Sequence, residues 1–479
     1  MSKLKIFLLP VISAILLGLT RIALPLDFLV FVAFIPLLHF FKITSGYTES
    51  VSVFRYFALI SGSVFAIIYL CISIHWINHV TVGGFFGILF LFTVVYSLIF
   101  YLVIKINKLN ERFIYISFPI LWLLNEFLWN FSEISFPWFN IAYGLKNSLN
   151  LLQFLEFGGT FLIGLLILMI NYLLFIGFTK RRYFIAISIA IITIWFGIGY
   201  MRREHIKRHT HEVDFIVAMI QGNITQDMKW EADMRDTTFD IYKQLSFEVN
   251  AEFNPDLIIF PEAALPVYIF LEPIYMKELQ SIVNTINTPI YTGFPHAVRE
   301  TKYDGQDSPF LHFNAAELFR PYERPKNDPY YKNILVPFGE RVPLLDKFPI
   351  LWRLQMGQAN FEPGTSTVIY DVGEFTFAPL ICFEIAFPYF IKNINKKHTP
   401  DFFVNITNDA WFYTSIGTIQ HAQMAAFRSI ETRKPIFRVA NTGYSFYTTP
   451  DGKIHEMTDL FERTFVVGRL QVYQNKKQN

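Results

Sequence analysis

Charged residues are scarce in this sequence, and cysteines are almost absent. Asp, Glu, Lys and Arg make up 17% of the 479 residues, whereas a soluble domain usually carries about 25%. The net charge is only +2, so nothing favours a nucleic acid as a partner. The only two cysteines are Cys71 and Cys382, which argues against a disulfide framework. The sequence also shows no cluster of metal-ligating residues.

The scarcity of charge is concentrated in the first 200 residues, which contain long apolar runs. A helix of about 20 apolar residues spans a bilayer, because every backbone polar group must be bonded within the helix. Apolar runs of roughly this length recur near residues 5–24, 26–41, 56–78, 84–104, 113–130, 159–178 and 183–200. We therefore predict a transmembrane helical domain of about seven spans over residues 1–201.

The distribution of Lys and Arg predicts that the N-terminus is cytoplasmic, since short cytoplasmic loops carry an excess of basic residues. With this orientation the inner segments hold Lys3, Lys5, Lys42, Arg55, Lys105, Lys108, Arg112, Lys180, Arg181 and Arg182, and the outer loops hold only Arg21 and Lys146. Seven spans then place residues 202–479 on the far side of the membrane, which in a bacterium is the periplasmic side of the inner membrane. The basic stretch 202–208 opposes this orientation.

After a linker at 202–213, residues 214–475 have the composition of a soluble domain. Short apolar runs predict strands at 214–221, 256–260, 289–294, 311–319, 375–381, 401–406 and 435–440, and helical patterns lie at 232–250, 272–287 and 417–433. This alternation favours an α/β domain built on packed sheets. The segment 449–453 predicts a turn between two further strands.

Three polar residues come where predicted strands end or a polar segment begins. Glu262 follows 256–260, Cys382 follows 375–381, and Lys332 opens KNILVPFGE. In acyl transfer a thiolate attacks the carbonyl, a carboxylate takes the thiol proton, and an ammonium stabilises the oxyanion. A nearby Lys is also expected to lower the pKa of the Cys. On spacing alone, however, a cysteine after an apolar strand is more often buried and inert.

Five ordered motifs change that interpretation. They are MIQGNITQDMKW (219–230), IIFPEAALP (258–266), YYKNILVPFGERVPL (330–344), LICFEIAFP (380–388) and the long segment 405–443. They closely resemble the nitrilase superfamily, and specifically its membrane-bound branch, the apolipoprotein N-acyltransferases. FPWFNIAYG (136–144) and the apolar spans also resemble that family, so the resemblance covers nearly the whole chain. It implies a nitrilase-like α-β-β-α sandwich after a multi-pass α-helical membrane domain.

The resemblance also implies roles for single residues. Glu262 would be the general base, Lys332 the oxyanion stabiliser and Cys382 the nucleophile. Glu340 matches a second essential acid that orients Lys332, with a turn-stabilising surface acid as the alternative.

Glu384 and Trp411 match further positions that line the family's site, with pure packing as an equal alternative for Trp411. Phe383, beside Cys382, is a further candidate for substrate contact. The stretch 341–365 is unusually apolar for a loop. Its residues, including Trp352 and Met356, would either form a mobile lid that guides acyl chains or pack against the protein.

The implied reaction is the third step of lipoprotein maturation. The cysteine takes an acyl chain from a phospholipid, typically phosphatidylethanolamine, and passes it from the thioester to the α-amino group of a diacylglyceryl-cysteine on an apolipoprotein. This chemistry requires no metal or organic cofactor, and nothing demands more than a monomer in the lipid membrane.

Several positions depart from the family pattern. The family usually has one more span after the catalytic domain, an Arg where Trp129 stands, and often a Tyr at Phe383. The segment 412–414 is also bulkier than usual. Two other interpretations therefore remain: a membrane-tethered amidase that passes the acyl group to water, and a catalytically silent membrane scaffold.

Overall fold

The computed structural model describes residues 3–46, 51–225, 233–300, 309–348, 350–351 and 360–474. The chain forms two compact units. Unit 1 comprises Met1–Ser132, Phe136–Glu204 and Ser415–Gln420, and unit 2 comprises Glu133–Ser135, His205–Thr414 and His421–Asn479.

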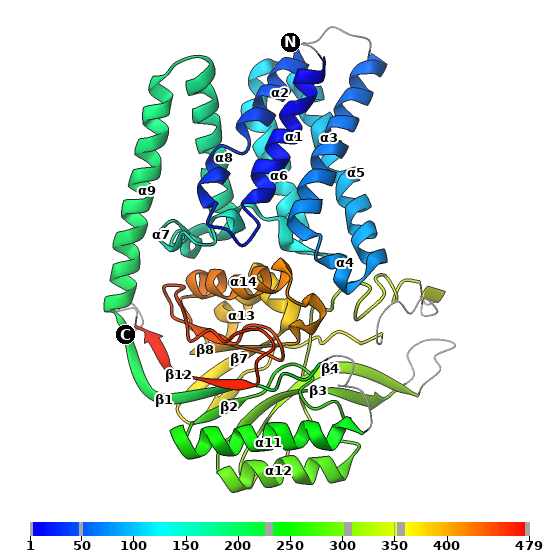
Figure 1. Ribbon diagram of the computed structural model, residues 1–479, viewed down its shortest axis with the longest axis vertical. Coiled ribbons are helices and arrows are strands. Elements are labelled where there is room, and N and C mark those ends of the chain that lie inside the picture. The colour runs from blue at the N-terminus through cyan, green and yellow to red at the C-terminus, as the bar shows by residue number, and fades with distance from the viewer. Residues whose placement is uncertain are drawn as a thin grey trace. The chain divides into compact units, whose positions relative to one another are not determined.

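The N-terminal part of the chain is helical (Figure 1). Its α-helices are α1 (Lys3–Leu19), α2 (Ile35–Ser45), α3 (Val51–Ile74), α4 (Ile77–Val80), α5 (Val82–Asn107), α6 (Ile114–Leu128), α7 (Leu149–Leu152), α8 (Leu155–Thr179) and α9 (Tyr183–Arg208). Short 3-10 turns lie at η1 (Asp27–Phe31), η2 (Glu111–Phe113), η3 (Pro137–Phe139) and η4 (Ile141–Leu145). Large aromatic side chains fill the interior of unit 1; for example, Phe34 meets Trp122 edge to face at 4.9 Å between ring centres.

Five of the predicted spans form helical stretches that are long and apolar enough to cross a membrane. They are Asp27–Ser45, Arg55–Ile74, Val82–Asn107, Leu155–Thr179 and Tyr183–Arg208. The other two predicted spans are shorter apolar helices, Leu4–Leu19 and Ile114–Leu128. At 1.5 Å per residue, the 15 residues of α6 reach only about 22 Å, less than the roughly 30 Å of a hydrocarbon core. The long apolar helices mark the chain as a membrane protein.

Unit 2 contains two sheets of six strands. The first has the order β12-β1-β2-β3-β4-β5 and the second β11-β10-β9-β8-β7-β6. The strands are β1 (Thr210–Gln221), β2 (Leu257–Ile259), β3 (Ile290–Arg299), β4 (Phe310–Phe319), β5 (Tyr330–Tyr331), β6 (Tyr370–Val372), β7 (Phe375–Ile381), β8 (Phe402–Thr407), β9 (Ile436–Ala440), β10 (Phe446–Thr448), β11 (Ile454–His455) and β12 (Thr464–Tyr473). The centre of each sheet is parallel, through β1-β2-β3 and β7-β8-β9, and the edges are antiparallel.

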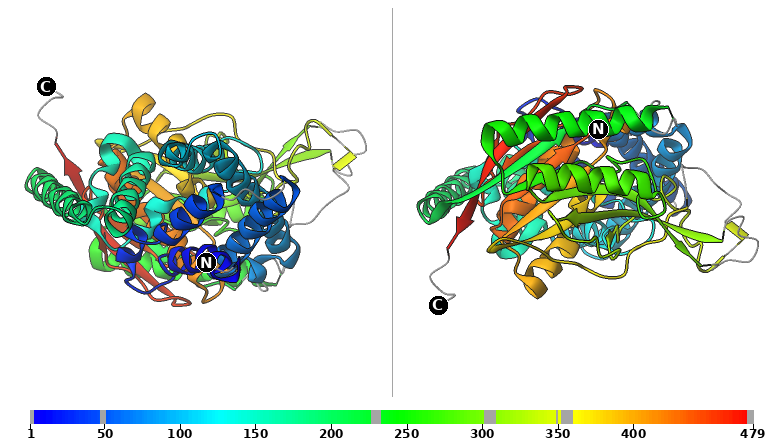
Figure 2. Two further views of the ribbon diagram at one scale, coloured as in Figure 1. Left: turned by 90° about the horizontal axis from the view of Figure 1, so that it is seen from above. Right: turned by 90° about the horizontal axis from the view of Figure 1, so that it is seen from below.

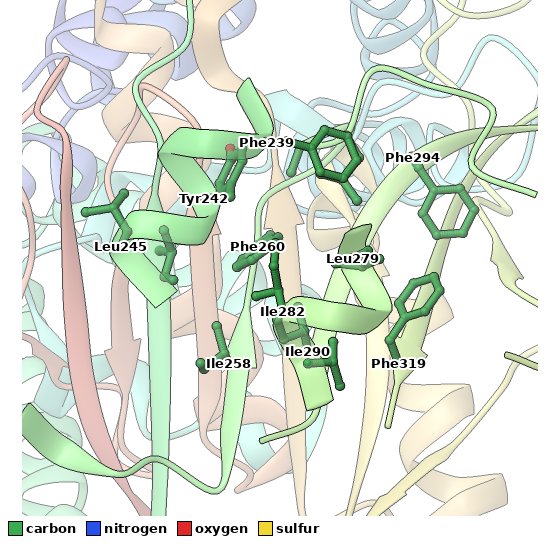
Figure 3. Close-up of a cluster of buried hydrophobic side chains, with 14 of the residues drawn as sticks. Phe239, Tyr242, Leu245, Ile258, Phe260, Leu279, Ile282, Ile290, Phe294 and Phe319 are labelled. Carbon is green, nitrogen blue, oxygen red and sulfur yellow. The ribbon is translucent and has the colours of Figure 1, made fainter. Parts of the chain in front are cut away.

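Two hydrophobic cores hold the layers of unit 2 together. Between the sheets, residues such as Met219, Ile259 and Tyr291 are buried against Phe377, Ile406 and Val439. On its other face the first sheet is covered by α11 (Met234–Phe253) and α12 (Pro273–Ile286), which lie side by side (Figures 1 and 2). Figure 3 shows that second core, in which Tyr242 and Leu279 of the helices meet Phe260 and Ile290 of the sheet.

With α13 (Pro388–His398) and α14 (Ile416–Thr432) on the side of the second sheet, these layers confirm the predicted α-β-β-α sandwich. The seven predicted strands and three predicted helices all form, with ends that differ by a few residues. The turn at 449–453 joins β10 to β11. Within the stretch predicted as a linker, 202–213, α9 continues to Arg208 and β1 begins at Thr210. Sequence patterns also missed β12, which pairs with β1 along most of its length.

Candidate active site

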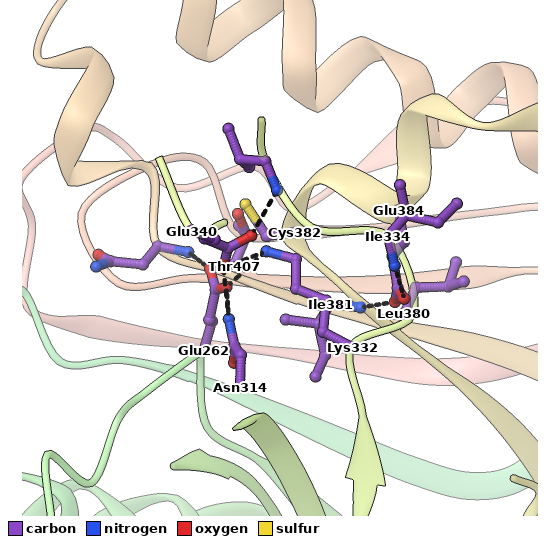
Figure 4. Close-up of polar contacts among 12 residues, drawn as sticks. Glu262, Asn314, Lys332, Ile334, Glu340, Leu380, Ile381, Cys382, Glu384 and Thr407 are labelled. Carbon is purple, nitrogen blue, oxygen red and sulfur yellow. Dashed lines mark hydrogen bonds and ion pairs between the residues drawn. The ribbon is translucent and has the colours of Figure 1, made fainter. Parts of the chain in front are cut away.

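The ends of three strands bring Glu262, Lys332 and Cys382 to one place in unit 2 (Figure 4). Glu262 follows β2, Lys332 follows β5 directly, and Cys382 is the residue after β7. Cys382 has a φ of 50°, a left-handed conformation that costs energy for a residue with a side chain. The chain turns sharply there, from β7 into the 3-10 turn η6 (Cys382–Ala386). We call this turn the nucleophile elbow.

Two carboxylates share the ammonium group of Lys332. Its Nζ donates to Glu262 Oε1 at 3.1 Å and to Glu340 Oε1 at 2.9 Å. The amide of Asn314 bridges the same two oxygens, at 2.7 Å and 2.9 Å. We call Glu262, Lys332 and Glu340 the shared-lysine cluster. The Lys332 side chain is only 1% exposed, and those of Glu262 and Glu340 are 8% and 15% exposed.

The remaining carboxylate oxygens of the shared-lysine cluster accept backbone hydrogen bonds. Asn408 N–H donates to Glu262 Oε2 at 2.8 Å, and Val336 N–H donates to Glu340 Oε2 at 2.8 Å. Both carboxylates are therefore stabilised as anions and fixed in direction. The two anions against one cation leave the cluster with a net negative charge beside the thiol.

The electrostatics around Cys382 differ in one respect from the sequence-based expectation. Burial acts to lower the pKa of Lys332, but Glu262 and Glu340 raise it well above its usual value, so the ammonium stays charged. Burial and then the Glu262 carboxylate raise the pKa of Cys382. Lys332 acts to lower that pKa, as expected, but its effect is smaller than the combined effect of burial and Glu262. The predicted influence of Lys332 is therefore present, but the net pKa of Cys382 is raised, and its side chain rests as a thiol.

Glu384 connects the residues on either side of Lys332 to the nucleophile elbow through hydrogen bonds. Its carboxylate accepts from the Tyr330 hydroxyl at 2.8 Å, from Asn333 N–H at 2.6 Å and from Ile381 N–H at 2.6 Å. Burial raises the pKa of Glu384 to about 7, against the effect of these donors. The side chain is fully buried, so the structure places Glu384 beneath the site, where it holds two active segments together.

A glycine permits the close approach of Glu262. Gly293 lies in β3, and a Cβ at that position would come within 2.7 Å of the Ala263 nitrogen and 2.9 Å of Glu262 Cα. Such contacts are sterically forbidden for backbone atoms. Any larger residue at 293 would displace the segment that carries the proposed base.

The other residues expected in the site are placed less centrally. Phe383 is buried and packs edge to face on Phe387 at 5.0 Å between ring centres. Trp411 is half-buried in the 3-10 turn η7 (Asp409–Phe412). Trp352 and Met356 lie outside the described residues.

Sequence reasoning missed the residues that support the site. Asn314 lies in the middle of β4, with no motif around it, and no pattern could have identified it. Thr407 hydrogen-bonds the Cys382 side chain, and Asn408 follows it; both lie in NITNDAW, within a segment that carried the family resemblance. Among the described residues, no three His, Cys, Asp or Glu side chains are arranged to hold a metal ion.

Comparison with known proteins agrees with this architecture. Residues 216–475 match the family described as carbon-nitrogen hydrolase, and residues 13–173 match the apolipoprotein N-acyltransferase N-terminal domain. Apolipoprotein N-acyltransferase of Geobacter metallireducens is 32% identical over 370 residues, which cover 74% of this chain and 68% of that protein. The corresponding protein of Haemophilus influenzae is 28% identical over 499 residues, covering 99% and 91%.

Among solved structures, an amidase from Nesterenkonia sp. is 15% identical with a TM-score of 0.40, covering 54% of this chain and 91% of the amidase. The two family matches and the identity to the Geobacter protein decide the assignment. The chain belongs to the apolipoprotein N-acyltransferases, a membrane-bound branch of the carbon-nitrogen hydrolase superfamily.

Proposed function

We propose that the protein transfers an acyl chain from a phospholipid, through a thioester on Cys382, to the α-amino group of an N-terminal diacylglyceryl-cysteine. The observation that carries this proposal is the buried ammonium of Lys332, shared by the carboxylates of Glu262 and Glu340 beside the thiol. A base, a cation and a nucleophile gathered in one site are what acyl transfer needs. The acceptor follows from relatives that are named apolipoprotein N-acyltransferases.

In the first half-reaction Glu262 takes the thiol proton as Cys382 Sγ attacks the ester carbonyl of the phospholipid. The raised pKa of Cys382 means that this proton must be removed in place, during attack, by a neighbouring base. Lys332 stabilises the oxyanion that forms. When the carbon–oxygen ester bond breaks, Glu262 returns the proton to the departing lysophospholipid oxygen, which leaves the thioester on Cys382.

In the second half-reaction the α-amine of the acceptor attacks the thioester carbonyl, which amines do readily. Glu262 takes a proton from the amine and passes it to Cys382 Sγ as the carbon–sulfur bond breaks. The products are an amide and the resting thiol. Glu340 positions Lys332 through both steps, since its other oxygen is held by the backbone of Val336.

The setting of the reaction is also part of the proposal. Lipid substrates account for the long apolar helices, and phosphatidylethanolamine is the proposed donor. Phe348 and Ile350 expose 55% and 72% of their surface, which supports contact of the 341–365 stretch with acyl chains.

The excess of Lys and Arg in the predicted inner loops supports a periplasmic catalytic domain in the bacterial inner membrane. We expect a monomer, and Phe383 and Trp411 are proposed to contact substrate.

The decisive experiment is an intact-mass assay with the full chain purified in detergent. The protein is mixed with phosphatidylethanolamine and a synthetic diacylglyceryl-cysteine peptide, with Cys382→Ala as the matched control. We expect the wild type to gain one acyl group on Cys382 and to pass it to the peptide, and the variant to do neither.

Each other result contradicts a stated part of the proposal. Acylation of Cys382 followed by release of free fatty acid would identify water as the acceptor and favour an amidase or esterase. If the folded wild type acquires no acyl group, the phospholipid donor is wrong. Equal peptide acylation by Cys382→Ala would exclude Cys382 as the nucleophile.

A further inference from the structure

A second group of buried polar residues lies beneath the nucleophile elbow, and the proposed chemistry does not use it. It consists of Asn405 in β8, Asp409 in η7, His421 in α14 and Arg438 in β9. Their side chains contact one another and the backbone of Cys382. We call these four residues the elbow clamp, and all of them belong to unit 2.

The guanidinium of Arg438 connects the members of the elbow clamp. Its Nη1 donates to Asn405 Oδ1 at 2.6 Å, and its Nη2 donates to Asp409 Oδ2 at 2.7 Å. The Arg438 and Asp409 side chains are 0% exposed. Burial alone would raise the pKa of Asp409, but Arg438 and His421 lower it to about 2, so the ion pair is fully formed.

Two donors of the elbow clamp reach the carbonyl oxygen of Cys382. His421 Nε2 lies 3.2 Å from it and Asn405 Nδ2 lies 3.5 Å from it. Asn405 also donates to the carbonyl of Leu380 at 3.2 Å. Because a carbonyl can only accept, Nε2 of His421 must carry a proton. On the other side of the ring, Nδ1 lies 2.9 Å from Asp409 Oδ1 and 3.1 Å from Arg438 Nη2, so the ion pair fixes the direction of the imidazole.

The carbonyl that the clamp holds controls the geometry of the reacting group. Cys382 has the left-handed φ of 50°, and this strained conformation persists only if surrounding contacts impose it. Peptide groups are planar and trans, so a fixed Cys382 carbonyl also fixes the N–H of Phe383 on the opposite side. The same plane contains Cα of Cys382, so it also fixes the point from which the thiol side chain extends.

Close packing beneath the clamp supports a positioning role. A Cβ at Gly443 would lie 2.6 Å from Asp409 Oδ2 and 2.7 Å from Asp409 Cβ, so the chain approaches Asp409 as closely as glycine allows. Thr407 donates to Asp409 Oδ1 at 2.9 Å and also hydrogen-bonds the Cys382 side chain. The clamp is therefore connected to the nucleophile through both its backbone and its thiol.

We propose that the elbow clamp positions Cys382 for attack by holding its backbone carbonyl through His421 and Asn405. Asp409, His421 and Arg438 are thus positioning residues that act through Cys382. The inference rests on the proposed role of Cys382 as nucleophile. It assigns a function to a buried ion pair that would otherwise be read as packing between η7, α14 and β9.

A matched pair of substitutions at His421 tests the proposal. The side-chain amide of His421→Gln can reach the place of imidazole Nε2 and donate to the Cys382 carbonyl, whereas the shorter amide of His421→Asn reaches only the place of Nδ1. Both replacements are polar and similar in chemistry. The readout is the rate constant for acylation of Cys382 by phosphatidylethanolamine in the detergent-purified full chain, with the midpoint of thermal unfolding measured alongside.

We expect His421→Asn to slow acylation about 10- to 100-fold at saturating phospholipid, because small errors in position cost rates of this size. The phospholipid concentration for half-maximal rate should not change. His421→Gln should stay within about threefold of wild type. Equal acylation rates for the two variants, whether both fast or both slow, overturn the positioning role. If His421→Asn does not fold, Asn405→Ser, which withdraws the second donor, takes its place with the same expectation of slower acylation.

A readout that needs no phospholipid separates this inference from the proposed function. Iodoacetamide alkylation of Cys382 is followed against pH in the same variants, with Cys382→Ala as the blank. Loss of the clamp should let water reach the thiol, so the midpoint in His421→Asn moves to lower pH by roughly half a unit or more, while His421→Gln keeps the wild-type profile. If the wild type is not acylated but the two profiles differ in this way, the proposed function fails and the positioning role stands. Identical profiles together with identical acylation rates refute the positioning role alone.

Discussion

Two buried charge clusters flank Cys382, and they differ in their balance of charge. The shared-lysine cluster has two carboxylates for one ammonium, and its acids keep 8% and 15% exposure. The elbow clamp has one carboxylate for one guanidinium, and both side chains are 0% exposed. The shared-lysine cluster has a net negative charge and is partly exposed, whereas the ion pair of the elbow clamp is neutral and fully buried.

This difference separates a reacting group from a supporting one. A carboxylate that must accept a proton needs surplus negative charge and access to the substrate. A carboxylate that only holds its neighbours is better kept as an anion, because an unpaired buried charge is costly. The pKa of Asp409, held near 2 by Arg438 and His421 against the effect of burial, shows that it stays ionised at all physiological pH values.

The largest effect should come from removing the cation of the shared-lysine cluster. Lys332→Met keeps the length of the side chain but leaves two adjacent carboxylates without their common partner. We expect the rate of Cys382 acylation to fall by about 10³-fold or more, since a lost oxyanion donor alone costs about 10²–10³. Acylation rates measured by intact mass check this prediction. A variant that stays within tenfold of wild type would remove Lys332 from the proposed mechanism.

Breaking the ion pair of the elbow clamp should mainly reduce stability. Arg438→Met leaves Asp409 buried as an unpaired anion, and such changes cost about 3–5 kcal/mol. The double variant Asp409→Leu/Arg438→Met removes both charges and should recover part of this loss. Thermal unfolding of the purified chain measures both values. With Asp409→Leu measured as the second single change, a double variant as destabilised as the sum of the two single variants would show that the pair is not coupled.

Acid should weaken the elbow clamp in a defined pH range. Because the folded pKa of Asp409 lies near 2 and the ordinary value is about 3.9, its contribution is fully present above about pH 4. It is lost as the pH falls through 2, and amounts to about 2–3 kcal/mol. Unfolding midpoints between pH 6 and pH 2 should therefore fall less steeply for Asp409→Leu/Arg438→Met than for wild type. Parallel curves would contradict this assignment.

The smallest effect concerns the influence of the negative cluster on the thiol. After burial, the carboxylate of Glu262 makes the largest contribution to the raised pKa of Cys382. Glu262→Gln keeps the shape of the side chain and removes this charge, so the apparent pKa for iodoacetamide alkylation should fall by about one pH unit. Glu340→Gln is the comparison, because it removes the other carboxylate that binds Lys332 and leaves Glu262 in place. A midpoint that rises in Glu262→Gln would reverse the assigned sign.

The sandwich could be predicted from the sequence because its central strands are short, apolar and separated by helical patterns. The strands at 375–381 and 257–259 are of this kind, with every residue of the latter buried. The strand β12 could not be predicted in this way, because Gly468, Arg469 and Gln471 interrupt its apolar run. Its pairing with β1 joins segments about 250 residues apart, which no local pattern reports.

The sequence could indicate the proposed reacting residues of the candidate site, but not the residues that support them. Glu262, Lys332 and Cys382 stand at strand ends inside distinctive motifs. Asn314 and Arg438 lie within strands, where a polar residue only breaks the apolar pattern of the sequence. The packed structure shows that each of them hydrogen-bonds two partners. The raised pKa of Cys382 could not be predicted from the sequence either. The effect of Lys332 comes from one neighbouring residue, whereas the burial that outweighs it depends on the whole fold.

The protonated state of Cys382 has a consequence for the lifetime of the protein. Disulfide exchange and oxidation begin from the thiolate, and burial with Glu262 suppresses that form. If the domain faces an oxidising compartment, as proposed, the same burial protects an unpaired cysteine where most would be lost to mixed disulfides. Oxidised glutathione should therefore modify Cys382 more slowly in the folded protein than in the denatured chain. Cys382 therefore stays unreactive until a bound substrate and a neighbouring base act on its thiol together.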